Sequence, residues 1–87
     1  MRERTDRQEQ GEENGMPLNL AEFGITYQIQ KVCGQEKQRH YLESLGFTEG
    51  SRVTVISELH GYYVVQIRES RIGLERSMAQ RIVLVPQ

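Results

Sequence analysis

The stretch LESLGFTEGSRVTVI, residues 42–56, joins two different hydrophobic periodicities and decides the fold. Before Gly46, apolar residues recur at helical spacing, and residues 35–45 contain no glycine, proline or β-branched residue. After Gly50, apolar and polar residues alternate over residues 52–57, which is typical of a half-buried strand. The stretch therefore predicts a helix that ends at Gly46 and a strand that begins after Gly50.

Both glycines in this stretch have a predicted structural role. Gly46 directly follows the last apolar residue of the helix, where a left-handed C-cap usually lies, and Leu or Ala would be strained there. Gly50 is expected to adopt the same kind of backbone conformation in the turn before the strand. The helical spacing places Tyr41, Leu42 and Leu45 on one face of the helix.

The flanking sequence predicts further short strands. Upstream, the alternation in residues 27–33, YQIQKVC, predicts a first strand with a bulge near Lys31. Downstream, a hairpin connection at residues 59–61 leads into a strand over residues 62–68, which places Tyr63, Val65 and Ile67 on one face. Short strands over residues 71–74 and 82–85 follow, with a short helix within residues 75–81 between them.

Together these elements predict a mainly β domain, a small barrel of about five strands. One helix lies between strands one and two, and a short helix precedes the last strand. Closing short strands into a barrel removes the exposed edges that invite aggregation. Ala79 is small enough for the short helix to lie close against the barrel, and the apolar segment with Leu18, Leu20 and Phe23 is expected to pack across the barrel's open end.

The first fifteen residues differ in composition from the rest of the chain. Eight of them are charged and Met1 is the only large apolar one, so we expect residues 1–15 to be a disordered tail and residues 16–87 to be the barrel domain. Met16 offers a second start, so the tail is either a native extension or a product of start-site choice. Residues 16–87 carry eight basic and seven acidic side chains, which argues against a nucleic acid partner.

The cysteine content and the lengths of the apolar runs indicate where the protein works. Cys33 is the single cysteine, so it forms no intramolecular disulfide, and at a strand end it is expected in the core. No run approaches the roughly 18 apolar residues of a transmembrane helix. No apolar segment follows the N-terminal arginines, as a secretory signal would require. The predicted location is the cytoplasm, without membrane insertion.

Two runs of this sequence are similar to the signature of the FeoA family, cytosolic accessory proteins of bacterial ferrous iron uptake. Residues 42–56 resemble the family's helix that ends in Leu-Gly-Phe before a second glycine and a strand, and residues 71–85, RIGLERSMAQRIVLV, resemble its closing pattern. The resemblance covers roughly residues 16–85. The sequence departs from it at Glu49, where the family often has proline, and at Tyr62 and Tyr63, which follow the glycine of the middle hairpin.

The resemblance implies an SH3-like barrel without catalytic activity that acts on FeoB, the membrane iron permease with a cytosolic GTP-binding domain. The same barrel is similar to the C-terminal domain of iron-dependent repressors, which implies an alternative function as a sensor of divalent transition metals. The residues agree with a protein that is not an enzyme, since no serine lies in a nucleophile elbow and no G-x-x-x-x-G-K-[ST] phosphate loop occurs.

Metal binding is one chemistry that the side chains permit. Imidazole and carboxylate donors suit Fe²⁺ or Zn²⁺, and the candidate ligands are His40, His60 and Glu36. Glu36 and His40 lie four residues apart on the predicted helix, a spacing that is more often a surface charge pair. His60 lies beside a loop glycine and is expected to be solvated.

Binding of a partner protein is the other function that the side chains permit. Its candidate residues are Leu59, Tyr62 and Tyr63 at one hairpin. Because side chains alternate along a strand, the two tyrosines point to opposite faces. One is therefore expected in the core. The other either anchors a partner protein or packs on the N-terminal segment through Leu18 or Leu20.

Overall fold

The computed structural model of the chain describes residues 15–87. The predicted charged tail lies outside the described residues, apart from Gly15. The elements in chain order are β1 (Met16–Pro17), the 3-10 helix η2 (Leu18–Leu20), β2 (Thr26–Val32), α2 (Glu36–Ser44), β3 (Arg52–Leu59), β4 (Tyr62–Ile67), β5 (Ser70–Glu75), α3 (Arg76–Ala79) and β6 (Ile82–Pro86).

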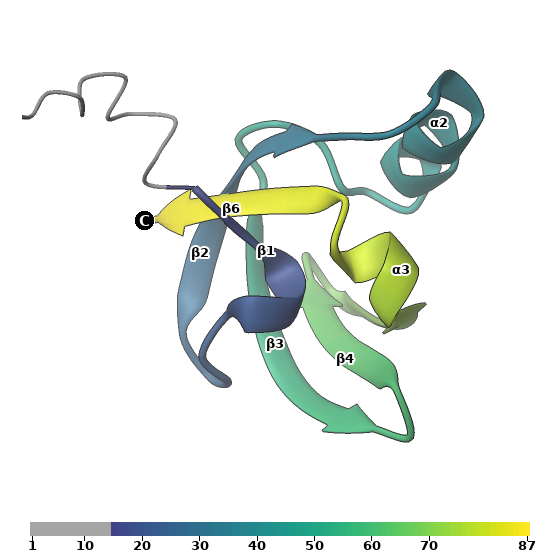
Figure 1. The fold of residues 1–87 in the computed structure, drawn as a ribbon. Coiled ribbons are helices and arrows are strands. Elements are labelled where there is room, and N and C mark those ends of the chain that lie inside the picture. Colours follow the sequence, from purple (N-terminus) through teal and green to yellow (C-terminus); the bar gives the residue numbers. More distant parts are fainter. Residues whose placement is uncertain (1–14) are drawn as a thin grey trace, which may run out of the picture.

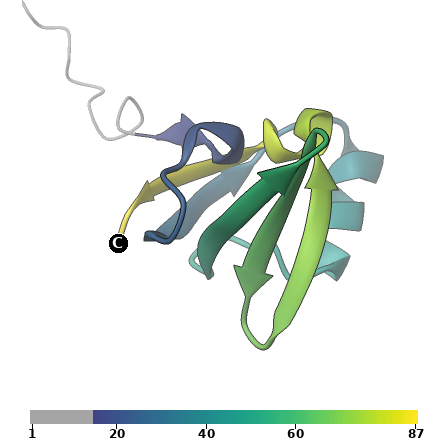
Figure 2. The same ribbon diagram turned by 90° about the horizontal axis from the view of Figure 1, so that it is seen from below.

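The strands form one antiparallel sheet in the order β1-β6-β2-β3-β4-β5, and this sheet curls round a common interior (Figures 1 and 2). The mainly β fold, the helix between the first long strand and the next, and the short helix before the last strand are confirmed. The sixth strand is β1, whose two residues pair with β6 at Met16–Leu84 and Pro17–Val83. It was too short to show a period in the sequence.

The core is one cluster of fifteen buried apolar side chains from every long element of the described chain. Burying this apolar surface is the main term that stabilises so small a domain. Its largest fully buried members include Phe47, Leu42 and Leu18. The cluster consists of Leu18, Ala21, Tyr27, Ile29, Leu42, Phe47, Val53, Val55, Tyr63, Val65, Ile67, Leu74, Ala79, Ile82 and Leu84.

A bulge in β2 lies where the sequence predicted it, and it reverses the alternation of the strand. The register of β2 against β6 shifts between Ile29 and Lys31, so Gln30 is the extra residue. Beyond the bulge, Val32 pairs with buried Ile82, and the next residue, Cys33, is exposed. The prediction that Cys33 lies in the core was therefore wrong, because the bulge turns its side chain outwards.

Helix α2 contacts the core through a narrower face than the sequence predicted. Leu42 is fully buried and Leu45 is partly buried, whereas 54% of Tyr41 is exposed. The helix begins after Gln35, whose backbone N–H donates to Gln38 Oε1 at 3.1 Å, and it ends at a turn in which Gly46 has a φ of 106°. Gly50 also has positive φ, at 89°.

The N-terminal segment also differs from its prediction. Leu18 is fully buried, but Leu20 is 65% and Phe23 is 52% exposed. Of the three predicted contacts only Leu18 is made, and Ala21, directly after η2, is the other buried side chain of this segment.

Replacing Gly46 by Ala tests the role of the left-handed turn. A Cβ at Gly46 would meet only Ile67 at ordinary contact distance, so the cost is backbone strain, about 1–2 kcal/mol of unfolding free energy. Gly73→Ala is the matched control, because Gly73 has neither a positive φ nor an atom within 4 Å of the added carbon. Urea unfolding should show a loss for Gly46→Ala and no loss for Gly73→Ala. Equal effects would contradict this account of the turn.

Candidate functional site

The β3–β4 hairpin has a two-residue turn formed by His60 and Gly61. Both residues have positive φ, 52° and 85°, which is the backbone of a type I′ turn. The Glu58 carboxylate accepts a hydrogen bond of 2.8 Å from the Gly61 N–H and so stabilises the turn. His60 is exposed at the tip of this hairpin.

A second bulge, in β3, decides which side chains this hairpin presents. Val53 and Val55 are buried, and the register against β4 shifts between Val55 and Ser57. Without this shift, alternation would turn Leu59 towards the core. With the shift, Leu59 pairs with Tyr62 on the outer face, where 63% of Leu59 and 49% of Tyr62 are exposed.

The outer face continues from Tyr62 to the end strand of the sheet. Tyr62 pairs with Glu75 of β5, and Val64 pairs with Gly73. Gly73 has no side chain, and no heavy atom lies within 4 Å of where its Cβ would be. This strand position is therefore open to a molecule from outside.

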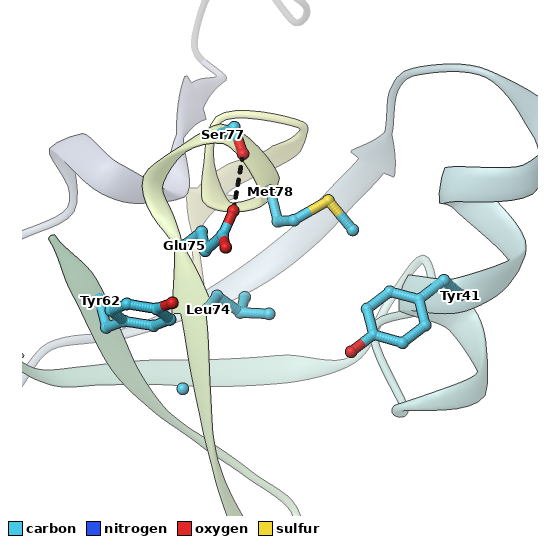
Figure 3. Close-up of a pocket in the computed structure, with 7 residues that line it drawn as sticks. Tyr41, Tyr62, Leu74, Glu75, Ser77 and Met78 are labelled. Atoms are coloured by element: carbon cyan, nitrogen blue, oxygen red, sulfur yellow. Dashed lines mark hydrogen bonds between the residues drawn. The ribbon is translucent and has the colours of Figure 1, made fainter.

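A hollow of about 360 Å³ lies beside this part of β5. Figure 3 shows Tyr41 of α2 and Tyr62 of β4 entering it from opposite sides, with their hydroxyl groups turned inwards. The Ser77 hydroxyl donates to Glu75 Oε1 at 3.4 Å at one edge of the hollow. The lining residues are Tyr41, Tyr62, Gly73, Leu74, Glu75, Ser77 and Met78.

Of the predicted partner residues, only two lie on the surface. Tyr63 is 7% exposed and belongs to the core cluster, because it alternates with Tyr62 along β4. Of the two tyrosines that the sequence placed on opposite faces, Tyr63 is therefore the one in the core and Tyr62 the one on the surface. Leu59 and Tyr62 are exposed, and Tyr62 lines the hollow together with Tyr41, Glu75 and Met78 from other parts of the chain.

The predicted metal ligands are only partly brought together. His40 Nε2 lies 3.9 Å from Glu36 Oε2 on one face of α2, with side chains that are 67% and 74% exposed. Within residues 15–87, no three His, Cys, Asp or Glu side chains form a group that could hold a metal ion, so His60 does not join the pair. Two ligands fall short of the three or four protein ligands of a typical zinc site.

None of the helices within residues 15–87 has the length and apolarity that crossing a bilayer requires.

The curled sheet, helix α2 between β2 and β3, and the short helix α3 before β6 define a small SH3-like barrel. The model of the FeoA domain family matches residues 16–86, which is nearly the whole described chain. The protein therefore belongs to the FeoA family. No curated protein gives a significant match to the sequence.

Solved structures support the same fold. A FeoA described as an iron uptake regulatory protein superposes with a TM-score of 0.75 at 21% identity, over 80% of this chain and 93% of that one. The FeoA of Stenotrophomonas maltophilia, an SH3 domain protein solved with zinc, has a TM-score of 0.70 at 23% identity, over 79% and 88% of the two chains. A manganese-dependent transcriptional repressor has a TM-score of 0.76 at 24% identity, over 84% of this chain but 42% of the repressor.

The left-handed backbone at His60 determines which substitutions there preserve the stability of the domain. Asn tolerates left-handed backbone better than His, and Asn-Gly is the preferred type I′ pair. His60→Asn should therefore leave the unfolding free energy unchanged or raise it by a few tenths of a kcal/mol. His60→Val, a β-branched residue at positive φ, should lower it by about 1 kcal/mol or more. Thermal unfolding of both variants measures this, and a destabilised His60→Asn would contradict the turn assignment.

Proposed function

We propose that this chain is a small accessory protein of ferrous iron uptake that binds the cytosolic part of a FeoB-type permease and catalyses no reaction itself. The observation that carries the proposal is the exposed pair Leu59 and Tyr62. The β3 bulge turns Leu59 outwards, beside Tyr62 on the outer face of β4. Family membership supports the iron uptake context. The cytoplasm is the compartment that this function requires.

The hairpin is suited to a protein partner for two reasons. An aromatic side chain that is half exposed in the free protein is a typical interface anchor, because binding buries much apolar area with little loss of side-chain entropy. The hairpin is also rigidly held, since its strands pair from Val53–Ile67 to Leu59–Tyr62 and Glu58 fixes its turn. A rigid surface binds with a smaller entropic cost than a flexible one.

The described residues favour a binding role over catalysis. The hollow contains one carboxylate and three hydroxyl groups, Tyr41, Tyr62 and Ser77, but no histidine, cysteine or lysine that could act as their base. Such a set can hydrogen-bond to a ligand. The base that it offers to the Ser77 hydroxyl is the exposed Glu75 carboxylate, over a long hydrogen bond of 3.4 Å.

Sensing of a divalent transition metal is the second candidate function, and the Glu36–His40 pair favours it. Related folds were solved with zinc, and others are named for manganese. In this chain the pair would hold Zn²⁺ or Fe²⁺ weakly, because both groups are exposed and no third ligand joins them in residues 15–87.

Binding to the permease can be located by substitution at the hairpin. The ¹⁵N-labelled full chain is titrated with the cytosolic domain of a FeoB-type permease. Leu59→Ser and Tyr62→Ser should each weaken binding about tenfold or more, since truncating an interface anchor costs more than about 1–2 kcal/mol. Phe23→Ser is the matched control, because Phe23 is similarly exposed, at 52%, but precedes β2. No binding by the unchanged chain, or equal loss in the control, would contradict the proposal.

A Zn²⁺ titration separates the two candidate functions. We expect shifts near His40 that do not saturate at equimolar metal, because two exposed ligands bind a metal weakly. His40→Gln should abolish these shifts, and His60→Asn should leave them unchanged. Saturation at equimolar Zn²⁺, with loss in both histidine variants, would instead favour the metal sensor.

A further inference from the structure

The hollow beside β5 has a chemistry that selects one kind of ligand. Its polar groups are the Glu75 carboxylate, which only accepts hydrogen bonds, and the hydroxyls of Tyr41, Tyr62 and Ser77, which can also accept them. Figure 3 shows both tyrosine hydroxyls pointing into the space between the two rings. Because Glu75 only accepts and the hydroxyls can accept as well, a ligand rich in donors can satisfy the whole set.

The carboxylate in this hollow forms no ion pair with any of the residues that the structure describes. Its hydrogen bond is to the Ser77 hydroxyl, at 3.4 Å. No lysine or arginine nitrogen of residues 15–87 lies within 4 Å of it. A positively charged ligand would therefore gain a charge-assisted hydrogen bond without displacing an existing ion pair.

The remaining walls of the hollow are apolar. Leu74 and Met78 line it between the two tyrosines (Figure 3). An arginine side chain combines the required parts, because its three methylene groups pack on apolar surface while its guanidinium offers five donors and stacks on aromatic rings. A volume of about 360 Å³ is sufficient for such a side chain.

Strand β5, beside the hollow, can bind the main chain of the segment that carries this arginine. β5 is the end strand of the sheet, so its outer edge pairs with no strand of the described residues. An extended peptide can add to such an edge through main-chain hydrogen bonds. Gly73, at the middle of the strand, has no side chain that could cover the hollow on the outer face.

We propose that the hollow formed by Tyr41, Tyr62, Leu74, Glu75 and Met78 binds an arginine side chain presented by an extended segment of a partner protein. This goes beyond the proposed function, because it holds whichever protein presents the arginine. Glu75 pairs with the guanidinium, the two tyrosine hydroxyls accept its remaining donors, and Leu74 and Met78 contact the methylene groups.

The test uses the ¹⁵N-labelled full chain at physiological salt and two short peptides, acetyl-Val-Arg-Val-amide and acetyl-Val-Cit-Val-amide. Citrulline has the shape of arginine without its charge. We expect the arginine peptide to cause saturable shifts at Gly73, Leu74, Ser77 and Met78, and the citrulline peptide to bind about tenfold more weakly or worse. Equal binding of the two peptides, or no shifts with either, would overturn the proposal.

Two variants and one matched control assign the effect to the hollow. Glu75→Gln should weaken the arginine peptide about tenfold and leave the citrulline peptide unchanged. Glu49→Gln is the matched control, because it removes one exposed carboxylate from the loop between α2 and β3 and should not change binding. Glu75→Gln could also disturb the start of α3, so a second variant tests the hollow independently. Tyr62→Phe removes only a hydroxyl and should weaken binding of the arginine peptide severalfold.

Other outcomes would overturn the proposal. Equal loss in Glu49→Gln would mean that net charge, instead of the hollow, attracts the peptide. Shifts at the hollow that appear on concentrating the protein alone would mean that a second copy of the chain occupies it. Because neither measurement contains the permease, failure here leaves the proposed function standing, and failure of permease binding leaves this inference standing.

Discussion

Two β-bulges determine which residues this small barrel buries and which it presents. Strict alternation from Tyr27 would bury Cys33, and strict alternation from Val53 would bury Leu59. The extra residues at Gln30 and Ile56 reverse both patterns, so Cys33 and Leu59 face outwards while Val32 packs against the core. A bulge costs part of the strand pairing, but here it lets strands with few core residues close around one cluster.

The β3 bulge links this architecture to the surface on which the functional proposals depend. By placing Leu59 opposite Tyr62, it extends the outer face of β4 into a band that continues to Glu75 and the open position at Gly73. Helix α2 adds Tyr41 from the other side of the hollow, and α3 adds Met78 (Figure 3). The band combines an apolar anchor at the hairpin with acceptor groups beside an end strand. This combination suits an extended protein segment better than it suits a small substrate or a metal ion.

The fold could be predicted from the sequence because its signals are local. The periodicity before Gly46, the alternation after Gly50 and the turn at His60-Gly61 each depend on a few neighbouring residues. The site could be predicted only in part, because Tyr41, Tyr62 and Met78 come together through tertiary packing that no local pattern records. Cys33 shows the same limit at a single position, because the pattern indicates a bulge near Lys31 but not which face the residues beyond it take. Tyr63 is the opposite case, because the alternation places it on one face with Val65 and Ile67, and all three are buried.

The most direct test of this account is the environment of Leu59 in solution. Nuclear Overhauser contacts of the folded chain, measured together with line broadening by a soluble gadolinium chelate, report both the pairing of the β3–β4 hairpin and the exposure of its side chains. The account predicts contacts between the Leu59 and Tyr62 side chains, with strong broadening of both and protection of Tyr63. Contacts of Glu58 with Tyr62, together with a protected Leu59, would show that β3 lacks the bulge, and the proposed surface would not exist.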